Sequence, residues 1–315
     1  MPIDPSRLGG VSILTVTPLD SAHRLIEKDF ISLLDFITAP VVEGEVVAGV
    51  TVCGEMGEGY ALTDEDKARV IRLCKRRLGP SKTVIAAVFA LSERDARHQS
   101  RLCAEAGADA LMVAPVAPFP YAERPLLRFF EAVGAESGLP LVAYLNKMYK
   151  PFPPDAILAA TYALHCVAAI KDSTGDAAFF DKLLAARPAG KLAIQTVTGL
   201  SLSSVRAGAD GLMIGTSNLL PKSALQVWAY GRNPDPSTQA RAQEAQDRLL
   251  KAAQIYKVGA PSSKDWVVVK EALAATGVIA EAARHPAPPY ELLSDPDRLL
   301  AAEQARALSA SERNT

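Results

Sequence analysis

Two side chains at the ends of apolar segments could take part in covalent chemistry. Lys171 directly follows the apolar segment 167–170. Burial at such a position disfavours the ammonium ion and lowers the pKa, and a neutral amine can attack a carbonyl carbon to form a Schiff base. From position alone, a lysine that reaches water past the strand end, or that pairs with Asp172, is an equally good interpretation. Tyr144 ends the apolar segment 141–143, where its phenol could transfer a proton to a reacting oxygen or could simply pack as an aromatic ring.

A short glycine-containing loop is a further candidate, because Gly54 and Gly57 enclose Glu55 and Met56. Glycines leave the backbone amides open to an anion, so this loop could hold a carboxylate. Two glycines at this spacing are common in loops, so the pattern alone is weak. The other polar residues at the C-terminal ends of predicted strands, or just after them, are Thr15, Thr17, Asn146, Thr196, Thr198 and the segment 215–218.

The elements that must position these residues follow from the alternation of short apolar segments with amphipathic stretches. The predicted strands are residues 12–17, 46–52, 84–88, 110–114, 141–145, 167–170, 192–196 and 211–214. Helices are predicted to begin near Thr63, Ser92 and Pro153, where capping residues precede acidic ones. Eight such units predict an α/β fold, a closed (β/α)₈ TIM barrel whose active site lies at the C-terminal ends of the strands. A doubly wound open sheet is the alternative.

The last part of the chain lacks strand patterns and is predicted to be helical over residues 237–256, 263–276 and from Asp295 onward. We therefore divide the chain into a barrel, residues 1–220, and a C-terminal helical segment, residues 221–315.

Composition limits the partners of the chain. The 315 residues are 49% hydrophobic and 22% charged, with a formal net charge of -1. This balance argues against a nucleic-acid-binding surface or a polybasic membrane patch, and favours a small-molecule partner. No apolar run approaches the roughly 20 residues of a membrane helix, and the first residues lack a secretion-signal pattern, so we expect a cytoplasmic protein. The four cysteines form no CxxC pair and the four histidines are scattered, so we predict no metal site.

Taken in order, the motifs resemble one family. They are Thr15-Val-Thr-Pro18, Gly54-Glu-Met-Gly-Glu58, Tyr144, Ile170-Lys-Asp-Ser-Thr-Gly175, Gly208-Ala-Asp-Gly211 continuing to Asn218, and Val269-Lys-Glu-Ala272. Over about residues 10–280 the chain resembles the dihydrodipicolinate synthase and N-acetylneuraminate lyase family of pyruvate-type class I aldolases. The combination is specific although each motif is not.

The resemblance implies a barrel with C-terminal helices, a homo-oligomer (a tetramer or a dimer), and no metal or organic cofactor. It implies that Lys171 forms an imine with the 2-oxo group of a 2-oxo acid and that Tyr144 transfers protons. The amides of the 54–57 loop would hold the substrate carboxylate. The residues expected to bind substrate are Gly54, Met56, Gly57, Asn146, Thr196, Thr198 and Met213.

The sequence also departs from the family pattern. Glu55 and Met56 replace the usual pair of threonines or serines, so no hydroxyl is available there. Three further departures are Lys147 in place of the proline of Asn-x-Pro, Tyr149 near the usual arginine with only Lys147 and Lys150 as basic substitutes, and Val116-Ala117 in place of an aromatic pair. Glu55 could take over the proton relay, which makes it a third candidate catalytic residue, or it could point into solvent.

These observations favour a Schiff-base-forming lyase, an aldolase or dehydratase, that acts on a 2-oxo acid such as a deoxy sugar acid or a substituted pyruvate adduct. Two alternatives stay open. One is a dihydrodipicolinate synthase, against which the missing hydroxyls argue. The other is a catalytically silent barrel that binds a keto acid as a sensor or interaction protein, against which the presence of both Lys171 and Tyr144 argues.

Overall fold

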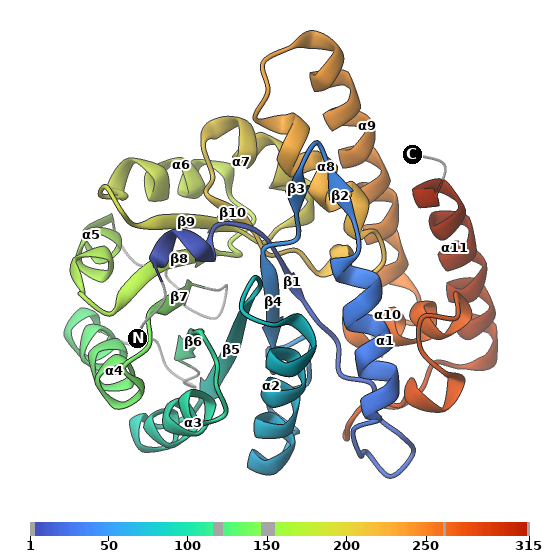
Figure 1. Ribbon diagram of the computed structural model, residues 1–315, viewed down its shortest axis with the longest axis horizontal. Coiled ribbons are helices and arrows are strands. Elements are labelled where there is room, and N and C mark those ends of the chain that lie inside the picture. Colours follow the sequence, from blue (N-terminus) through green and yellow to red (C-terminus); the bar gives the residue numbers. More distant parts are fainter. Residues whose placement is uncertain (1–3, 116–121, 146–154, 261–262, 314–315) are drawn as a thin grey trace.

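Eight parallel strands close into a barrel at the centre of the molecule (Figure 1). The computed structural model describes residues 4–115, 122–145, 155–260 and 263–313. The barrel strands are β1 (Gly10–Leu14), β4 (Gly49–Val52), β5 (Thr83–Ala90), β6 (Ala110–Pro115), β7 (Leu141–Leu145), β8 (Val167–Asp172), β9 (Leu192–Gln195) and β10 (Gly211–Leu212). They pair in chain order, and β10 returns to pair with β1. The predicted TIM barrel is confirmed, and the open sheet is excluded.

Helices follow the strands and surround the barrel. They are α1 (Glu27–Thr38), α2 (Asp64–Leu78), α3 (Glu93–Glu105), α4 (Glu123–Ser137), α5 (Asp155–Ala163), α6 (Ala177–Ala186), α7 (Ser201–Ala207) and α8 (Pro221–Gly231). Two predicted starts are confirmed by their caps. Thr63 and Asp66 form a reciprocal capping box on α2, and the Ser92 side chain accepts a hydrogen bond from the Asp95 amide of α3. Short 3₁₀ turns are η1 (Pro5–Leu8), η2 (Thr198–Leu200), η3 (Gly215–Asn218), η4 (Gln254–Lys257) and η5 (Glu281–Ala283).

Two elements differ from the prediction. The segment 46–52 is not one strand, because β3 (Glu45–Val46) pairs antiparallel with β2 (Val41–Val42), and the barrel strand β4 begins only at Gly49. A Cβ on Gly49 would lie 2.2 Å from the carbonyl oxygen of Thr83, so glycine permits the close approach of β5 there. Helix α8, which we did not predict, begins with a proline in its first turn.

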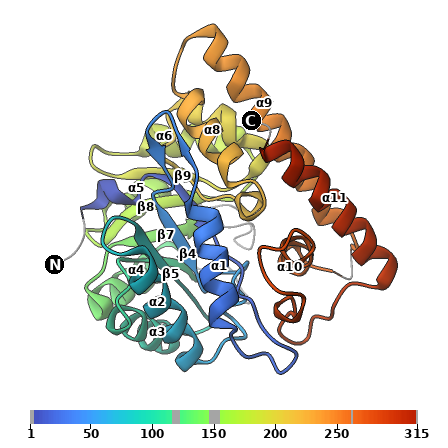
Figure 2. The same cartoon turned by 45° about the vertical axis from the view of Figure 1, so that its right-hand side comes forward.

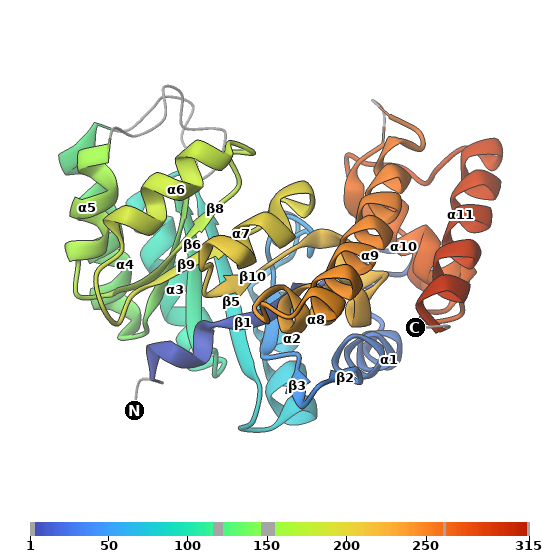
Figure 3. The same ribbon diagram turned by 90° about the horizontal axis from the view of Figure 1, so that it is seen from above.

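The C-terminal helices lie together on one side of the barrel (Figure 2 and Figure 3). They are α9 (Pro236–Ala253), α10 (Asp265–Ala275) and α11 (Asp295–Arg313), which confirms the three predicted helical stretches. Glu312 on α11 accepts hydrogen bonds from the amide and the hydroxyl of Ser223 on α8, at 3.0 and 2.5 Å. Since α8 contacts both β1 and α9, it joins the barrel to these helices. The division at residue 220 stays a prediction.

The inside of the barrel is filled by apolar side chains, and polar side chains lie at the C-terminal ends of the strands. Side chains such as Ile85, Met112, Val142 and Met213 form its buried cluster, and Leu8 from η1 packs into the same cluster. At the C-terminal ends of the strands this cluster is followed by polar side chains that line a cavity. Within the described ranges, no helix has the length and apolarity needed to cross a bilayer.

Candidate active site

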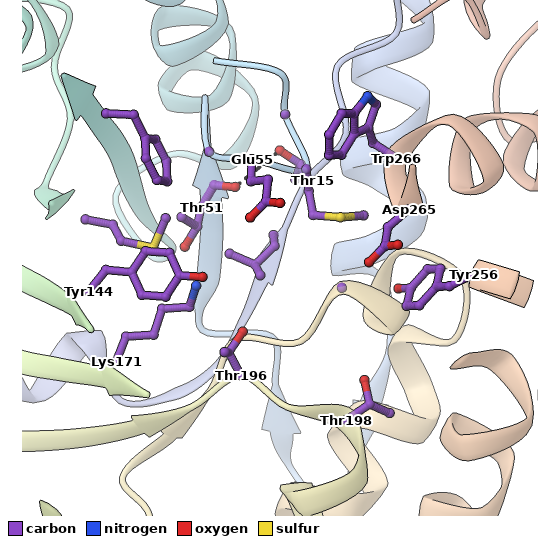
Figure 4. Close-up of a pocket in the computed structure, with 17 residues that line it drawn as sticks. Thr15, Thr51, Glu55, Tyr144, Lys171, Thr196, Thr198, Tyr256, Asp265 and Trp266 are labelled. Atoms are coloured by element: carbon purple, nitrogen blue, oxygen red, sulfur yellow. Dashed lines mark hydrogen bonds between the residues drawn. The ribbon is translucent and has the colours of Figure 1, made fainter. Parts of the chain in front are cut away.

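A cavity of about 170 Å³ lies at the C-terminal ends of the barrel strands (Figure 4). Most of the predicted site residues line it: Gly54, Glu55, Met56, Gly57, Tyr144, Lys171, Thr196 and Thr198. Asn146, like the departures at 116–117, Lys147, Tyr149 and Lys150, lies outside the described residues. The structure thus brings together side chains from several barrel strands and their following loops.

Lys171 and Tyr144 are adjacent because β7 and β8 pair in a register that sets one opposite the other. The Nζ atom of Lys171 lies 3.6 Å from the centroid of the Tyr144 ring. Both side chains are buried, with Lys171 only 2% exposed. An amine and a phenol ring are therefore held side by side in a buried position.

Burial lowers the pKa of Lys171 from 10.5 to about 7, against the opposing effect of the carboxylates of Glu55 and Asp172. No ion pair links Lys171 to Asp172 in the described part of the chain. Instead, one Asp172 carboxylate oxygen accepts a hydrogen bond from the Thr174 amide at 2.8 Å. The amine is therefore substantially unprotonated near neutral pH, which is the state that attacks a carbonyl carbon.

This shift gives a direct prediction for competitive acetylation with trace acetic anhydride, quantified by mass spectrometry. Because only the free amine reacts, labelling of Lys171 should rise with pH with a midpoint near pH 7. The exposed Lys251 serves as the internal control for the reagent. A Lys171 midpoint at the ordinary lysine value of 10.5 would contradict the effect of burial.

The loop that follows β4 is held in a tight, strained conformation. Cys53 and Glu58 have φ angles of 56° and 54°, in the left-handed region that residues other than glycine rarely adopt. A Cβ on Gly59 would lie 1.7 Å from the Cys53 carbonyl oxygen, so that position requires glycine. The Thr17 hydroxyl donates a hydrogen bond to the Gly57 carbonyl at 2.7 Å. These constraints fix the backbone of the 54–57 loop beside the cavity.

A buried ion pair anchors the same loop from outside the barrel. The Glu58 carboxylate pairs with the ammonium of Lys270 on α10, and both side chains are 0% exposed. Lys270 Nζ also donates to the His285 carbonyl at 2.8 Å, and the Ala287 amide donates to Glu58 Oε2 at 2.6 Å. The C-terminal segment therefore holds the end of the glycine loop in place.

Met56 and Glu55, which stand where the family usually has two hydroxyl-bearing residues, have different environments. Met56 is 9% exposed, and its Sδ and Cε atoms lie 3.6 Å from where a Cβ on Gly215 would be, so it forms an apolar wall. Glu55 is exposed, and its carboxylate projects into the cavity (Figure 4).

The predicted binding residues that follow β9 and β10 contact each other or a neighbouring hydroxyl. The Thr196 hydroxyl donates a hydrogen bond to the Met213 carbonyl, and the Thr198 and Thr216 hydroxyls lie 3.1 Å apart. The Met213 side chain is buried in the barrel interior below the cavity. Met213 is not among the described residues that line the cavity. Thr196 and Thr198 remain candidates for binding, whereas Met213 supports them from beneath.

Sequence reasoning missed three residues that line the cavity from the C-terminal segment: Tyr256, Asp265 and Trp266. Tyr256 belongs to η4, and Asp265 and Trp266 belong to the first turn of α10. An acidic residue in the first turn of a helix is an ordinary start signal, so the sequence offered no reason to assign it to the site. In the described ranges, no three potential metal-ligating side chains gather in one place.

A closed barrel with a polar cavity at the C-terminal ends of its strands is the architecture of a TIM-barrel enzyme. The chain belongs to the dihydrodipicolinate synthetase family, whose model matches residues 7–299. Members of this family are class I aldolase-type lyases and synthases. The predicted resemblance is confirmed.

Individual relatives are distant. A 4-hydroxy-tetrahydrodipicolinate synthase of Bacillus velezensis is 25% identical over 301 residues, 93% of this chain and 96% of the relative. An N-acetylneuraminate lyase of Fusobacterium nucleatum matches with a TM-score of 0.81 and 19% identity over 95% of this chain and 98% of the other. A prophage protein of the dihydrodipicolinic acid synthase family from E. coli K12, solved in complex with pyruvate, matches with a TM-score of 0.83 and 20% identity over the same shares. At these identities the solved structures support the fold.

Proposed function

We propose that this protein is a Schiff-base-forming lyase that acts on a 2-oxo acid, with Lys171 as the amine that attacks the substrate. The observation that carries the proposal is the juxtaposition of a buried lysine, whose pKa is lowered to about 7, and the Tyr144 ring 3.6 Å from its Nζ atom. The pyruvate complex of the E. coli relative supports the choice of a 2-oxo acid.

In the proposed reaction the Lys171 amine adds to C2 of the 2-oxo acid, and the resulting carbinolamine loses water to give an iminium ion. The positively charged nitrogen then accepts the electron pair released when a bond at the neighbouring carbon breaks. We assign the binding of the substrate carboxylate to backbone amides of the 54–57 loop, whose conformation is fixed. Cleavage as an aldolase and elimination of water as a dehydratase both pass through this iminium ion.

Tyr144 supplies the proton in this scheme. Burial raises the pKa of its hydroxyl to about 12, so the phenol is neutral at physiological pH and acts first as a proton donor. Its natural acceptor is the carbinolamine oxygen, which leaves as water. Glu55, whose carboxylate projects into the same cavity, is our candidate for returning the proton.

A second candidate function is the condensation catalysed by a dihydrodipicolinate synthase, favoured by the name of the Bacillus relative. Glu55 and Met56 offer no hydroxyl in the loop that usually carries two, and this argues against it. Condensation of pyruvate with aspartate semialdehyde at a rate comparable to lyase turnover would favour the synthase. The silent-barrel alternative would be favoured by a complete lack of turnover on a panel of hydroxylated 2-oxo acids. A homo-oligomeric state, a cytoplasmic location and the lack of a cofactor stay predictions.

The proposal is tested by incubating the protein with pyruvate and sodium borohydride, followed by peptide mass spectrometry. We expect reduction of the imine to leave a stable adduct on Lys171 and on no other lysine. Absence of an adduct with pyruvate and with longer 2-oxo acids, or an adduct on a different lysine, would reject the proposed function.

Removing only the Tyr144 hydroxyl separates proton transfer from imine chemistry. Tyr144→Phe should reduce turnover by about 10²- to 10⁴-fold, the usual contribution of a positioned acid or base. The borohydride adduct should still form, more slowly, because Lys171 is retained. Tyr162→Phe is the matched control: this buried hydroxyl donates to the Leu192 carbonyl at 3.1 Å, away from the cavity, and its loss should change stability by about 1 kcal/mol but not turnover. Equal turnover in the Tyr144→Phe variant and the wild type would remove Tyr144 from the mechanism.

A further inference from the structure

We infer that Asp265 and Glu55 determine which 2-oxo acids the cavity accepts: they favour a tail that carries hydroxyl groups and exclude a tail that ends in a second carboxylate. This inference rests on the proposed function, since it concerns the part of the substrate that extends away from Lys171. In this inference Asp265, on a helix outside the barrel, selects the substrate, whereas residues at the strand ends carry out the chemistry.

The geometry places these groups at the far side of the cavity from the amine. Lys171 and Tyr144 lie at one side, Asp265 and Tyr256 lie at the other, and the carboxylate of Glu55 lies between them (Figure 4). A substrate bound through its 2-oxo group to Lys171 and extending along the cavity would therefore pass Glu55 and approach Asp265.

The carboxylates of Glu55 and Asp265 both line this space. Within the described residues, neither Glu55 nor Asp265 forms an ion pair. The pKa of Asp265 is raised by burial and by the negative charge of Glu55, while the neighbouring Lys264 lowers it less. Two acceptors that repel each other are stabilised by hydrogen-bond donors placed between them, and a third carboxylate would increase the repulsion.

The Tyr256 hydroxyl supplies an independent observation at the same place. Its oxygen is fully buried and has no hydrogen-bond partner among the described residues. It is close to Gly215, where an added Cβ would lie 2.9 Å from it, so glycine at that position leaves room for it. A buried hydroxyl without a partner is unfavourable, and a ligand hydroxyl that reaches it would remove this cost.

The test compares two six-carbon 2-oxo acids that differ at the tail, 2-keto-3-deoxygluconate with hydroxyls and 2-oxoadipate with a terminal carboxylate. Borohydride trapping on Lys171 is measured for both, relative to pyruvate. In the wild type we expect half-saturation at a concentration on the order of tenfold lower for 2-keto-3-deoxygluconate. Asp265→Lys should reverse the preference. The milder Asp265→Asn should reduce it and so guards against a folding defect, and Glu55→Gln tests the second carboxylate separately.

Asp295→Asn is the matched control, because Asp295 also occupies the first turn of a helix but is 87% exposed on α11. Its preference should equal that of the wild type. Pyruvate trapping combined with no preference in the wild type, or with a preference that none of the three cavity variants changes, would overturn this inference and leave the proposed function intact. Failure to trap pyruvate in the wild type would instead reject the proposed function itself.

Discussion

Lys171→Met will abolish turnover and borohydride trapping while making the folded protein more stable. Without the amine no imine can form, and the rate should fall to background, at least about 10⁶-fold below wild type, the lower range of enzymatic acceleration. Methionine has a similar length and shape and can occupy the same buried space beside the Tyr144 ring. The loss of activity would therefore not come from unfolding.

The gain in stability follows from proton linkage. The folded pKa of Lys171, about 7, lies below its unfolded value of 10.5, so the unfolded state binds the extra proton between these values. Folding therefore carries a cost that is fully present below pH 7 and disappears as the pH rises to 10.5. At pH 7 this cost is about 4 kcal/mol, and the Lys171→Met variant avoids it.

Urea unfolding of the variant and the wild type at pH 7 and pH 10 checks this result, since the difference between the two proteins should shrink at the higher pH. Lys251→Met, at an exposed site, should change neither stability nor activity. Turnover that survives in Lys171→Met would show that the amine is not part of the reaction.

Lys270→Met should destabilise the protein more than any of the other single substitutions. It leaves the Glu58 carboxylate buried without its partner, and breaking a fully buried ion pair by removing one member costs about 3–5 kcal/mol. It should also raise the KM for the 2-oxo acid more than it lowers kcat, because Glu58 ends the loop proposed to bind the substrate carboxylate. Urea unfolding and steady-state kinetics measure the two effects.

The double variant Glu58→Gln/Lys270→Met distinguishes charge from packing. Removing both charges should recover much of the lost stability, since no buried charge remains unpaired. The introduced side-chain amide could still accept, through its oxygen, the hydrogen bond that the Ala287 backbone now donates to Glu58. If the double variant were as unstable as the sum of both single variants, the ion pair would not be the source of the effect.

The pairing of Lys171 with Tyr144 was predictable from the sequence because each residue lies at the end of an apolar strand. Neighbouring parallel strands end at the same face of a barrel. The glycine loop was predictable for the same reason. Tyr256 and Asp265 were not, because their approach to the cavity depends on how η4 and α10 pack beside the barrel. The ion pair between Glu58 and Lys270 was not predictable either, since a glutamate in a loop and a lysine in a helix are ordinarily solvent-exposed.

Some limits of strands and helices were also predictable from the sequence, and others were not. Segments with a strong cap or a distinct apolar run begin where they were predicted: α2 follows its cap Thr63, and β8 begins at Val167. The continuous apolar character of residues 46–52 concealed the break between β3, which pairs with β2, and β4, which begins at Gly49. Local pattern therefore set the type of each element, and long-range contact set where it ends.

Helix α10 carries Asp265 in its first turn, facing the cavity, and Lys270 farther along, holding the loop beside the amine. The groups that we propose for bond making lie on the barrel, whereas the group that we propose for selection lies on a separate helix. Evolution can thus exchange the first turn of α10 to admit a new substrate without touching Lys171 or Tyr144. The same helix limits this freedom, because any change that displaces Lys270 would disturb the loop as well.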